Sequence, residues 1–370
     1  MTVWLQNPFD NLPLEGYRKQ RYWMLAEAFA SAGHEVVCFT SDFSHATKRP
    51  RILSGTPPFR LVLLKTSPYA KNVSWARVRS HRAYAREWLR IATDAASRLP
   101  RPDLIVSSFP TISAAETAIV LGRRFGAKTV VDVQDAWPET FERLFPRPLR
   151  FLAKIAFAPL RRRAKRIFAA ADRVTGVCDA YRELTGRADY RRAYLGIGLR
   201  PLAPAPARAR PSVRLVYAGG LGRTYDLATL VKAVERNEDF ELDVAGFGAF
   251  ASACSRIRFH GPLGADDLRA LFACCDVGLV PMDASSHVGV PNKFFDYSEA
   301  GLAIVSSLKG ESADLLRTYR CGATYRPGSA ASLAAAVREA AALARGASRR
   351  MCETEFDASR IYTDLVSFLV

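Results

Sequence analysis

A basic and an acidic residue three positions apart mark the segment of this chain best suited to chemistry. Lys293 and Asp296 lie in a run that Pro291 opens and Gly301 closes, which is typical of a short helix. Residues three apart share one helix face, here close to its positive N-terminal end. A cation beside free backbone N–H groups suits a diphosphate, and a carboxylate one turn further suits ribose hydroxyls. The segment predicts a nucleotide-binding helix, with a plain capped helix bearing a solvated Lys and Asp as the alternative.

Two glycine turns follow buried strands in the same half of the chain. The first contains Gly220 and Gly222 and is followed by Arg223, whose forked guanidinium suits a phosphate that glycines allow close to the backbone. The second, at Gly246, follows the next strand and lacks the full dinucleotide fingerprint. The first turn predicts a phosphate contact. For Gly246 a contact with the nucleotide and a purely structural turn both stay open.

Together these segments resemble the nucleotide-sugar signature of glycosyltransferase family 4, retaining enzymes of the GT-B fold. The resemblance implies an α/β protein with two doubly wound (Rossmann-like) parallel-sheet domains that face each other across a cleft. It also implies a nucleotide-diphosphate sugar as co-substrate and retention of configuration. Arg223, Lys293 and the helix N-terminus would stabilise the departing diphosphate. No metal or other cofactor is expected, because the sequence has no Asp-x-Asp motif.

The chain departs from the family pattern just before this helix. Many members carry two glutamates with seven residues between them, whereas here the second is Asp296 and the first position holds Val288. The contact to the donor sugar is therefore expected from backbone N–H groups of Val288, Gly289 and Val290, or from His287. The identity of the sugar is left open.

The first half of the chain carries its own candidates. Gly16, with Arg18 behind it, lies in a polar loop after the first strand, where the family has a glycine loop near the donor phosphates. A solvated first helical turn at Arg18, Lys19 and Arg21 is the alternative.

Asp135 follows a buried strand in a stretch that resembles the Asp-x-Trp-Pro stretch of the family. It is predicted to be catalytic, either by bonding a sugar hydroxyl or by orienting the acceptor oxygen. Trp137 is a candidate for stacking on a sugar ring, although an aromatic residue before proline is often part of a core.

Positive charge is concentrated in the first half. Of a net +17, residues 1–199 hold 33 basic and 17 acidic residues, a net +16, while residues 200–370 hold 20 and 19, a net +1. This asymmetry favours a polyanionic partner, an anionic membrane or a nucleic acid. Arginines mix with aromatic and aliphatic residues at 75–91 and 143–166, as in helices that lie in a membrane interface. A solvated helix is the alternative.

No recognised nucleic-acid motif accompanies this charge, so we expect no nucleic-acid partner. The charge alone suggests a lipid-linked or other glycan as the acceptor. The residues predicted to form an acceptor or membrane surface are Arg18, Trp75, Trp88, Trp137, Arg161, Arg162 and Arg163.

The elements that must position these residues alternate between β and α from end to end, which predicts parallel sheets. With 370 residues, two domains are expected: residues 1–199 for the acceptor and 213–355 for the nucleotide sugar, joined by a proline-rich linker at 200–212. By the resemblance, an amphipathic helix at 356–370 returns to the first domain. The expected strands are 3–6, 35–40, 61–64, 103–107, 128–133, 173–178, 214–218, 241–245, 257–260, 277–280, 303–306 and 323–325.

The sequence also suggests a location. It starts with a strand-like run in place of a signal peptide, and it has no apolar stretch of about 18 residues. Its seven scattered cysteines have no zinc spacing. We expect a cytoplasmic protein peripheral to the membrane. A nucleotide-sugar 2-epimerase of the same fold and a non-catalytic nucleotide- or nucleic-acid-binding protein stay open as alternatives.

Overall fold

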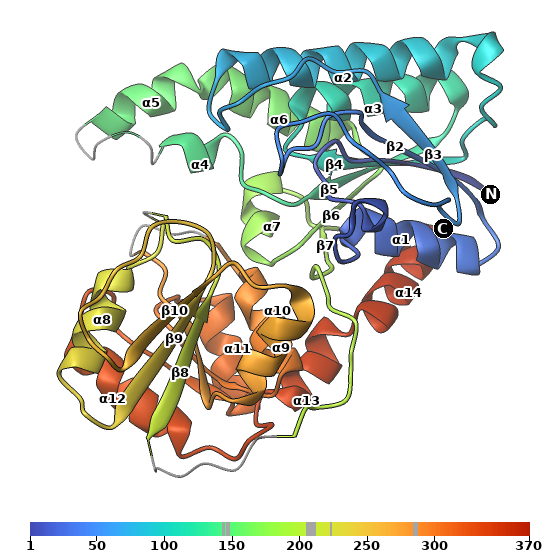
Figure 1. The fold of residues 1–370 in the computed structure, drawn as a ribbon. Helices are drawn as coiled ribbons and strands as arrows, with labels where there is room; N and C mark the ends of the chain where they lie inside the picture. Colours follow the sequence, from blue (N-terminus) through green and yellow to red (C-terminus); the bar gives the residue numbers. More distant parts are fainter. Residues whose placement is uncertain (143–144, 146–148, 205–211, 223, 284–287) are drawn as a thin grey trace. The chain divides into compact units, whose positions relative to one another are not determined.

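The computed structural model of the protein describes residues 1–142, 145, 149–204, 212–222, 224–283 and 288–370. The chain divides into two compact units, and each is described by itself (Figure 1). The first unit is Met1–Leu195 together with Ser359–Val370, and the second is Gly196–Ala358. These divisions fall within a few residues of the expected limits at 199 and 356. No helix among the described residues is long and apolar enough to cross a membrane.

The first unit is built on a seven-stranded parallel sheet in the order β3-β2-β1-β4-β5-β6-β7. Its strands are β1 (Thr2–Gln6), β2 (Glu35–Ser41), β3 (Arg60–Leu64), β4 (Leu104–Phe109), β5 (Lys128–Val133), β6 (Arg173–Gly176) and β7 (Arg191–Arg192). Its helices are η1 (Pro13–Glu15), α1 (Arg21–Ser31), α2 (Trp75–Thr93), η2 (Ala95–Ser97), α3 (Ile112–Phe125), α4 (Glu139–Glu142), α5 (Arg150–Ala156), α6 (Ala158–Ala170), α7 (Ala180–Thr185) and α14 (Ala358–Leu369). Figure 1 shows α2, α3 and α6 on one face of the sheet and α1 and α14 on the other.

Helix α2 contributes aromatic residues to the core of this unit. Tyr84 and Trp88 have exposed fractions of 1% and 0% and pack with Phe39 and the central strands. Trp88 is therefore wrongly predicted as part of a surface. It lies four residues after Tyr84 on the inner face of the helix, while Trp75, at the start of the helix, is 82% exposed.

Two buried arginines fix the loop between β1 and α1. Arg21 makes a double ion pair with Asp132 on β5, with N–O distances of 2.8 Å, and is 2% exposed. Arg51 donates to the carbonyl of Asp10 at 2.7 Å and pairs with Glu15. A solvated first turn is thus wrong for Arg21. Lys19 precedes the helix, and its half-exposed side chain pairs with Glu27.

The second unit contains a six-stranded parallel sheet in the order β10-β9-β8-β11-β12-β13. Its strands are β8 (Val213–Ala218), β9 (Phe240–Ala245), β10 (Ile257–Gly261), β11 (Val277–Val280), β12 (Ala303–Ser306) and β13 (Gly322–Thr324). Its helices are α8 (Leu227–Glu235), α9 (Ala265–Ala273), α10 (Asn292–Glu299), α11 (Glu311–Tyr319), α12 (Ala330–Ala341), α13 (Arg349–Met351) and the π-turn η4 (Cys352–Phe356). All twelve expected strands are present, and within the described ranges the two-residue β7 is the additional strand.

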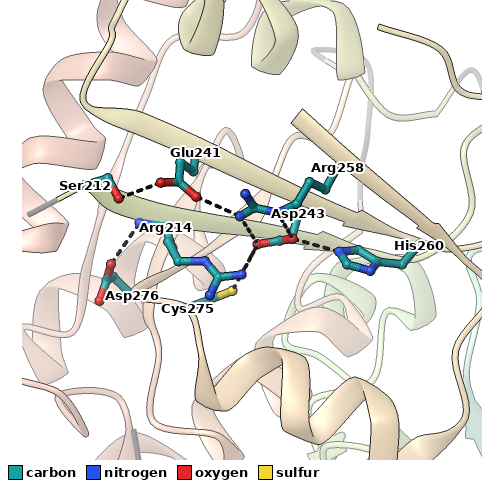
Figure 2. Close-up of polar contacts among 8 residues, drawn as sticks. All are labelled: Ser212, Arg214, Glu241, Asp243, Arg258, His260, Cys275 and Asp276. Carbon is teal, nitrogen blue, oxygen red and sulfur yellow. Dashed lines mark hydrogen bonds and ion pairs between the residues drawn. The ribbon is translucent and has the colours of Figure 1, made fainter. Parts of the chain in front are cut away.

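A buried carboxylate ties together three strands of this second sheet (Figure 2). Asp243 on β9 is 0% exposed and accepts from Arg214 on β8 at 2.8 Å. From β10 it accepts from Arg258 at 2.9 Å, and it hydrogen-bonds with the His260 ring at 2.7 Å. Burial by itself raises the pKa of Asp243, but the bonds from Arg258, His260 and Arg214 outweigh it and lower the pKa to about 2.

Candidate active site

Lys293 lies in the first turn of α10, which begins directly after Pro291. The extended backbone of Pro291 caps the helix, and Lys293 is turned inward with an exposed fraction of 7%. Its Nζ lies 4.1 Å from the ring centroid of Tyr225 and 4.9 Å from that of Tyr217. The ammonium is thus held between two aromatic rings at the carboxyl end of β8.

The turn after β8 closes over this ammonium. A Cβ on Gly219 would come within 2.6 Å of Lys293 Nζ, and the φ of Gly219 is +144°, so the position requires glycine. A Cβ on Gly246 would reach 1.7 Å from the Gly219 carbonyl oxygen. Gly246 therefore permits the turns after β8 and β9 to pack together. Gly220 and Gly222 lie in the same turn, each with open space where a Cβ would be.

Lys293 is electrostatically unsatisfied. Burial lowers its pKa to about 8, and the charge of Asp296 only partly restores it. Among the described residues Nζ has no hydrogen bond or ion pair, and the two tyrosine rings flank it. A buried cation beside a glycine turn can hold an anion whose oxygens approach the backbone.

The other predicted nucleotide-binding residues lie on and before α10. Asp296 is half-buried on the helix, Val290 is 7% exposed and Val288 is 39% exposed. The carbonyl of Gly289 accepts from Ser312 Oγ. Two predicted residues, Arg223 and His287, lie outside the described residues. Across the described residues no three His, Cys, Asp or Glu side chains gather as metal ligands would, and the expectation of metal-free chemistry stays a prediction.

Sequence reasoning missed three neighbours of Lys293. Its surroundings are formed by Tyr217, Tyr225 and Gly219. In the sequence these are an aromatic residue in a strand, an aromatic residue in a loop and one glycine among several. Tyr225 after the glycine turn was the only available signal.

In the first unit, Asp135 follows β5 and anchors its own segment. Its carboxylate accepts from the indole Nε1 of Trp137 at 3.0 Å and from Thr140 Oγ1 at 3.1 Å. Burial raises the pKa of Asp135, while these bonds and the charge of Arg77 act against the rise. A carboxylate with a raised pKa can exchange a proton with a substrate hydroxyl.

The structure gathers some of the predicted acceptor residues and leaves others apart. Trp75, Trp137 and Arg163 line one cavity of about 630 Å³ between α2, α3 and α6. Arg163 also forms a double ion pair with Glu116, at 2.7 and 2.5 Å.

The remaining candidates lie elsewhere in the first unit. Arg162 is exposed, and Arg161 donates to the carbonyl of Lys154. Gly16 and Arg18 are exposed beside η1, where Gly16 has a φ of +81°.

Comparisons with known proteins agree with this architecture. Residues 19–195 match the family described as glycosyl transferase 4-like domain, and residues 212–342 match glycosyl transferases group 1. The probable glycosyltransferase WbjE of Pseudomonas aeruginosa is 24% identical over 247 residues, covering 60% of this chain and 61% of WbjE. The match therefore spans about three fifths of that relative's length.

Solved structures resemble the whole chain. Sucrose-phosphate synthase from Thermosynechococcus elongatus has a TM-score of 0.75 at 16% identity, with 100% of this chain and 98% of that chain covered. Anabaena HepE in complex with UDP and glucose has a TM-score of 0.68 at 13% identity, with 100% and 99% covered. These likenesses concern the fold, and the two family matches together take in most of the sequence. The chain belongs to the glycosyltransferases of the GT-B fold, of the family 4 type.

Proposed function

We propose that the chain transfers a sugar from a nucleotide-diphosphate donor to a glycan or lipid-linked acceptor. The observation that carries the proposal is the Lys293 ammonium, which is buried, has no anionic partner within bonding distance among the described residues and lies against the turn at Gly219. A diphosphate would supply the negative charge that Lys293 lacks. Its oxygens can approach a backbone that carries no side chain, as at a glycine. Since the similar HepE structure is a complex with UDP and glucose, UDP is the first nucleotide to test.

Each residue has a defined part in this proposal. Lys293, the N–H groups at the start of α10 and Arg223 stabilise the negative charge that develops on the leaving diphosphate. Asp296 accepts hydrogen bonds from the ribose hydroxyls. Asp135 orients the acceptor oxygen, and the leaving phosphate takes the acceptor's proton. This route uses no metal and retains the configuration of the sugar.

Calorimetry with nucleosides and nucleoside diphosphates tests the donor site. Lys293→Ala should weaken UDP binding by roughly 10- to 100-fold, since a charge-assisted bond contributes about 1.5–3 kcal/mol, and uridine binding should change little. Lys232→Ala serves as the control, because Lys232 is an exposed cation on α8. If Lys293→Ala weakened uridine and UDP equally, Lys293 would not be a phosphate contact. If Lys293 is a phosphate contact, a screen of UDP-, GDP- and dTDP-sugars for donor hydrolysis identifies the donor.

A further inference from the structure

Four basic side chains gather beside the cavity of the first unit, on α2 and on the segment after β2. Lys48 Nζ lies 3.3 Å from Nδ1 of His45 and donates to Asn72 Oδ1 at 2.6 Å. Arg77 donates to the His81 ring at 3.3 Å and to the carbonyl of Asn72 at 2.9 Å. The two pairs therefore meet at Asn72, and we call these four residues the basic cluster.

Aromatic rings hold the basic cluster in place. The Arg77 guanidinium lies 4.8 Å from the ring centroid of Trp137 and 5.0 Å from that of Phe9. The His81 ring stacks on Trp137 with centroids 5.8 Å apart at 25°. His45 hydrogen-bonds with the hydroxyl of Tyr69 at 2.5 Å. The cations are thus fixed by packing and not by opposite charge.

No ion pair within the described part of the chain balances this charge. Among the described residues, no carboxylate comes within 4.0 Å of Lys48 or Arg77. Burial and the nearby basic groups lower the pKa of His45 to about 4 and that of His81 to about 3. Burial and the charge of Arg77 lower the pKa of Lys48, and burial lowers the pKa of Arg77. The carboxyl group that acts on Arg77 is that of Asp135. An anion bound here would relieve the repulsion.

The cavity that begins at the basic cluster continues along apolar walls. Asn72, Arg77 and His81 line its charged end. Its apolar lining includes Val73, Trp75, Val78, Ile112, Phe145 and Leu160. Of these, Val73 is 61% and Trp75 is 82% exposed, which leaves a large apolar surface in contact with water. A purely polar glycan would not cover this surface, whereas a hydrocarbon chain would.

We propose that this cavity binds a prenyl or long-chain alkyl phosphate, with the phosphate or diphosphate at the basic cluster and the hydrocarbon chain along the apolar walls. Charge complementarity and the apolar lining select this class of molecule over a free anion or a neutral lipid. The proposal rests on the function proposed above only in treating the bound molecule as the sugar acceptor. Binding itself is independent of sugar transfer.

Binding of three matched probes tests the proposal. Farnesyl diphosphate, farnesol and inorganic pyrophosphate are titrated into the full-length protein below the critical micelle concentration, with tryptophan fluorescence and calorimetry as readouts. Farnesyl diphosphate should bind at least tenfold more tightly than either of the others. Arg77→Gln and Lys48→Gln should each weaken it about tenfold and leave farnesol binding unchanged. Arg79→Gln, which removes an exposed charge from the same helix outside the cavity, should have no effect.

Two results would overturn the proposal. One is farnesyl diphosphate binding no more tightly than farnesol, which would identify a general apolar site. The other is an equal loss in Arg79→Gln, which would identify a diffuse charge effect. Nuclear magnetic resonance on the unaltered protein gives a readout that does not depend on how the variants fold. The pKa of His81 should rise when farnesyl diphosphate binds, and it should stay constant if the basic cluster is only structural. If farnesyl diphosphate binds and UDP does not, the donor function fails and this proposal stands.

Discussion

At the scale of single residues, the recurring feature is a cation without an anion. Lys293 in the second unit and Arg77 in the first are both packed against aromatic rings, and neither has a carboxylate partner within ion-pair distance among the described residues. The sequence predicted Lys293 from its position at a helix start. It could not predict Arg77, because one arginine among many in an arginine-rich helix looks solvated until its packing is known.

The lowered pKa of Lys293 predicts a pH-dependent donor affinity. With a pKa of about 8 in the free protein, Lys293 is charged at pH 7 and mostly neutral at pH 9.5. UDP affinity should therefore fall by about 30-fold between these two pH values if only the charged form binds. Lys293→Arg should remove this dependence, because arginine keeps its charge. Calorimetry across this range decides the matter, and a flat profile in the unaltered protein would contradict it.

His81 predicts a second, opposite pH effect, on stability. Its folded pKa of about 3 lies below the ordinary 6.5, so unfolding takes up a proton between these values and stability falls as pH drops through that window. Burial is the main cause of the lowered pKa, and Arg77 and His45 lower it further. At pH 5 the cost is about 2 kcal/mol. Urea unfolding of the unaltered protein and His81→Gln should therefore differ less at pH 5 than at pH 7, and a constant difference would show that His81 does not titrate this way.

Asp135 predicts an effect on turnover. Asp135→Asn keeps an oxygen that can accept from Trp137 and loses the negative charge, so turnover should fall by about 100-fold or more while UDP affinity is unchanged. Thr140→Val is the control, because it removes the hydrogen bond from Thr140 and leaves the carboxylate in place. Near-normal transfer by Asp135→Asn would exclude a catalytic role.

At the scale of elements, the sequence predicted where strands and helices lie along the chain better than which side chains pair between them. The expected strands are present because apolar, β-branched runs of this length favour strands of a sheet that is buried on both faces. The two-residue β7 carries too little pattern to be predicted. Trp88 was misjudged because alternation with arginines suggests a mixed surface, whereas helical spacing places Tyr84 and Trp88 on one buried face. Asp243 bonds with Arg214, Arg258 and His260 from two other strands, and such pairing depends on register.

The buried network of Figure 2 predicts a large and pH-dependent stability effect. Asp243→Asn leaves two arginines and the His260 ring without their carboxylate and should lower the free energy of unfolding at pH 7 by about 3 kcal/mol. Because the pKa of Asp243 is lowered to about 2, this contribution is complete above about pH 4 and is lost as pH falls towards 2. Urea unfolding measures both.

Asp314→Asn is the matched control for this substitution. Asp314 pairs with Arg317 on an exposed helix face, so its loss should change stability by less than about 1 kcal/mol. Similar effects of the two substitutions would mean that burial does not strengthen the Asp243 network.

At the scale of the whole molecule, net charge points to a membrane surface, and this stays a prediction. On α5, Phe151 and Ile155 are 60% and 67% exposed and lie four residues apart, so one helix face presents an apolar strip beside basic residues. The sequence predicted the amphipathic character of this region. It could not show that Arg163 pairs with Glu116, in an ion pair whose side chains are 36% and 40% exposed.

The vesicle prediction is accordingly placed on exposed residues. Arg162→Ser combined with Arg166→Ser should weaken binding to anionic vesicles by roughly 10-fold or more, since each basic residue near the surface contributes about 1 kcal/mol. Arg123→Ser combined with Arg124→Ser removes the same charge from the end of α3 and is the control. Co-sedimentation with anionic and neutral liposomes at rising salt measures the effect. No binding to anionic vesicles at low salt would end the membrane prediction.

The C-terminal helix has a consequence for how the chain is made. Tyr362 in α14 is 2% exposed and donates to the carbonyl of Leu195 at 2.6 Å, and Leu365 and Leu369 are buried in the same unit. A ribosome synthesises the second unit before it reaches these residues. More than 160 residues are therefore translated between the main part of the first unit and helix α14, which completes it. During that time the groups that α14 covers lack their partner and are open to chaperones and proteases.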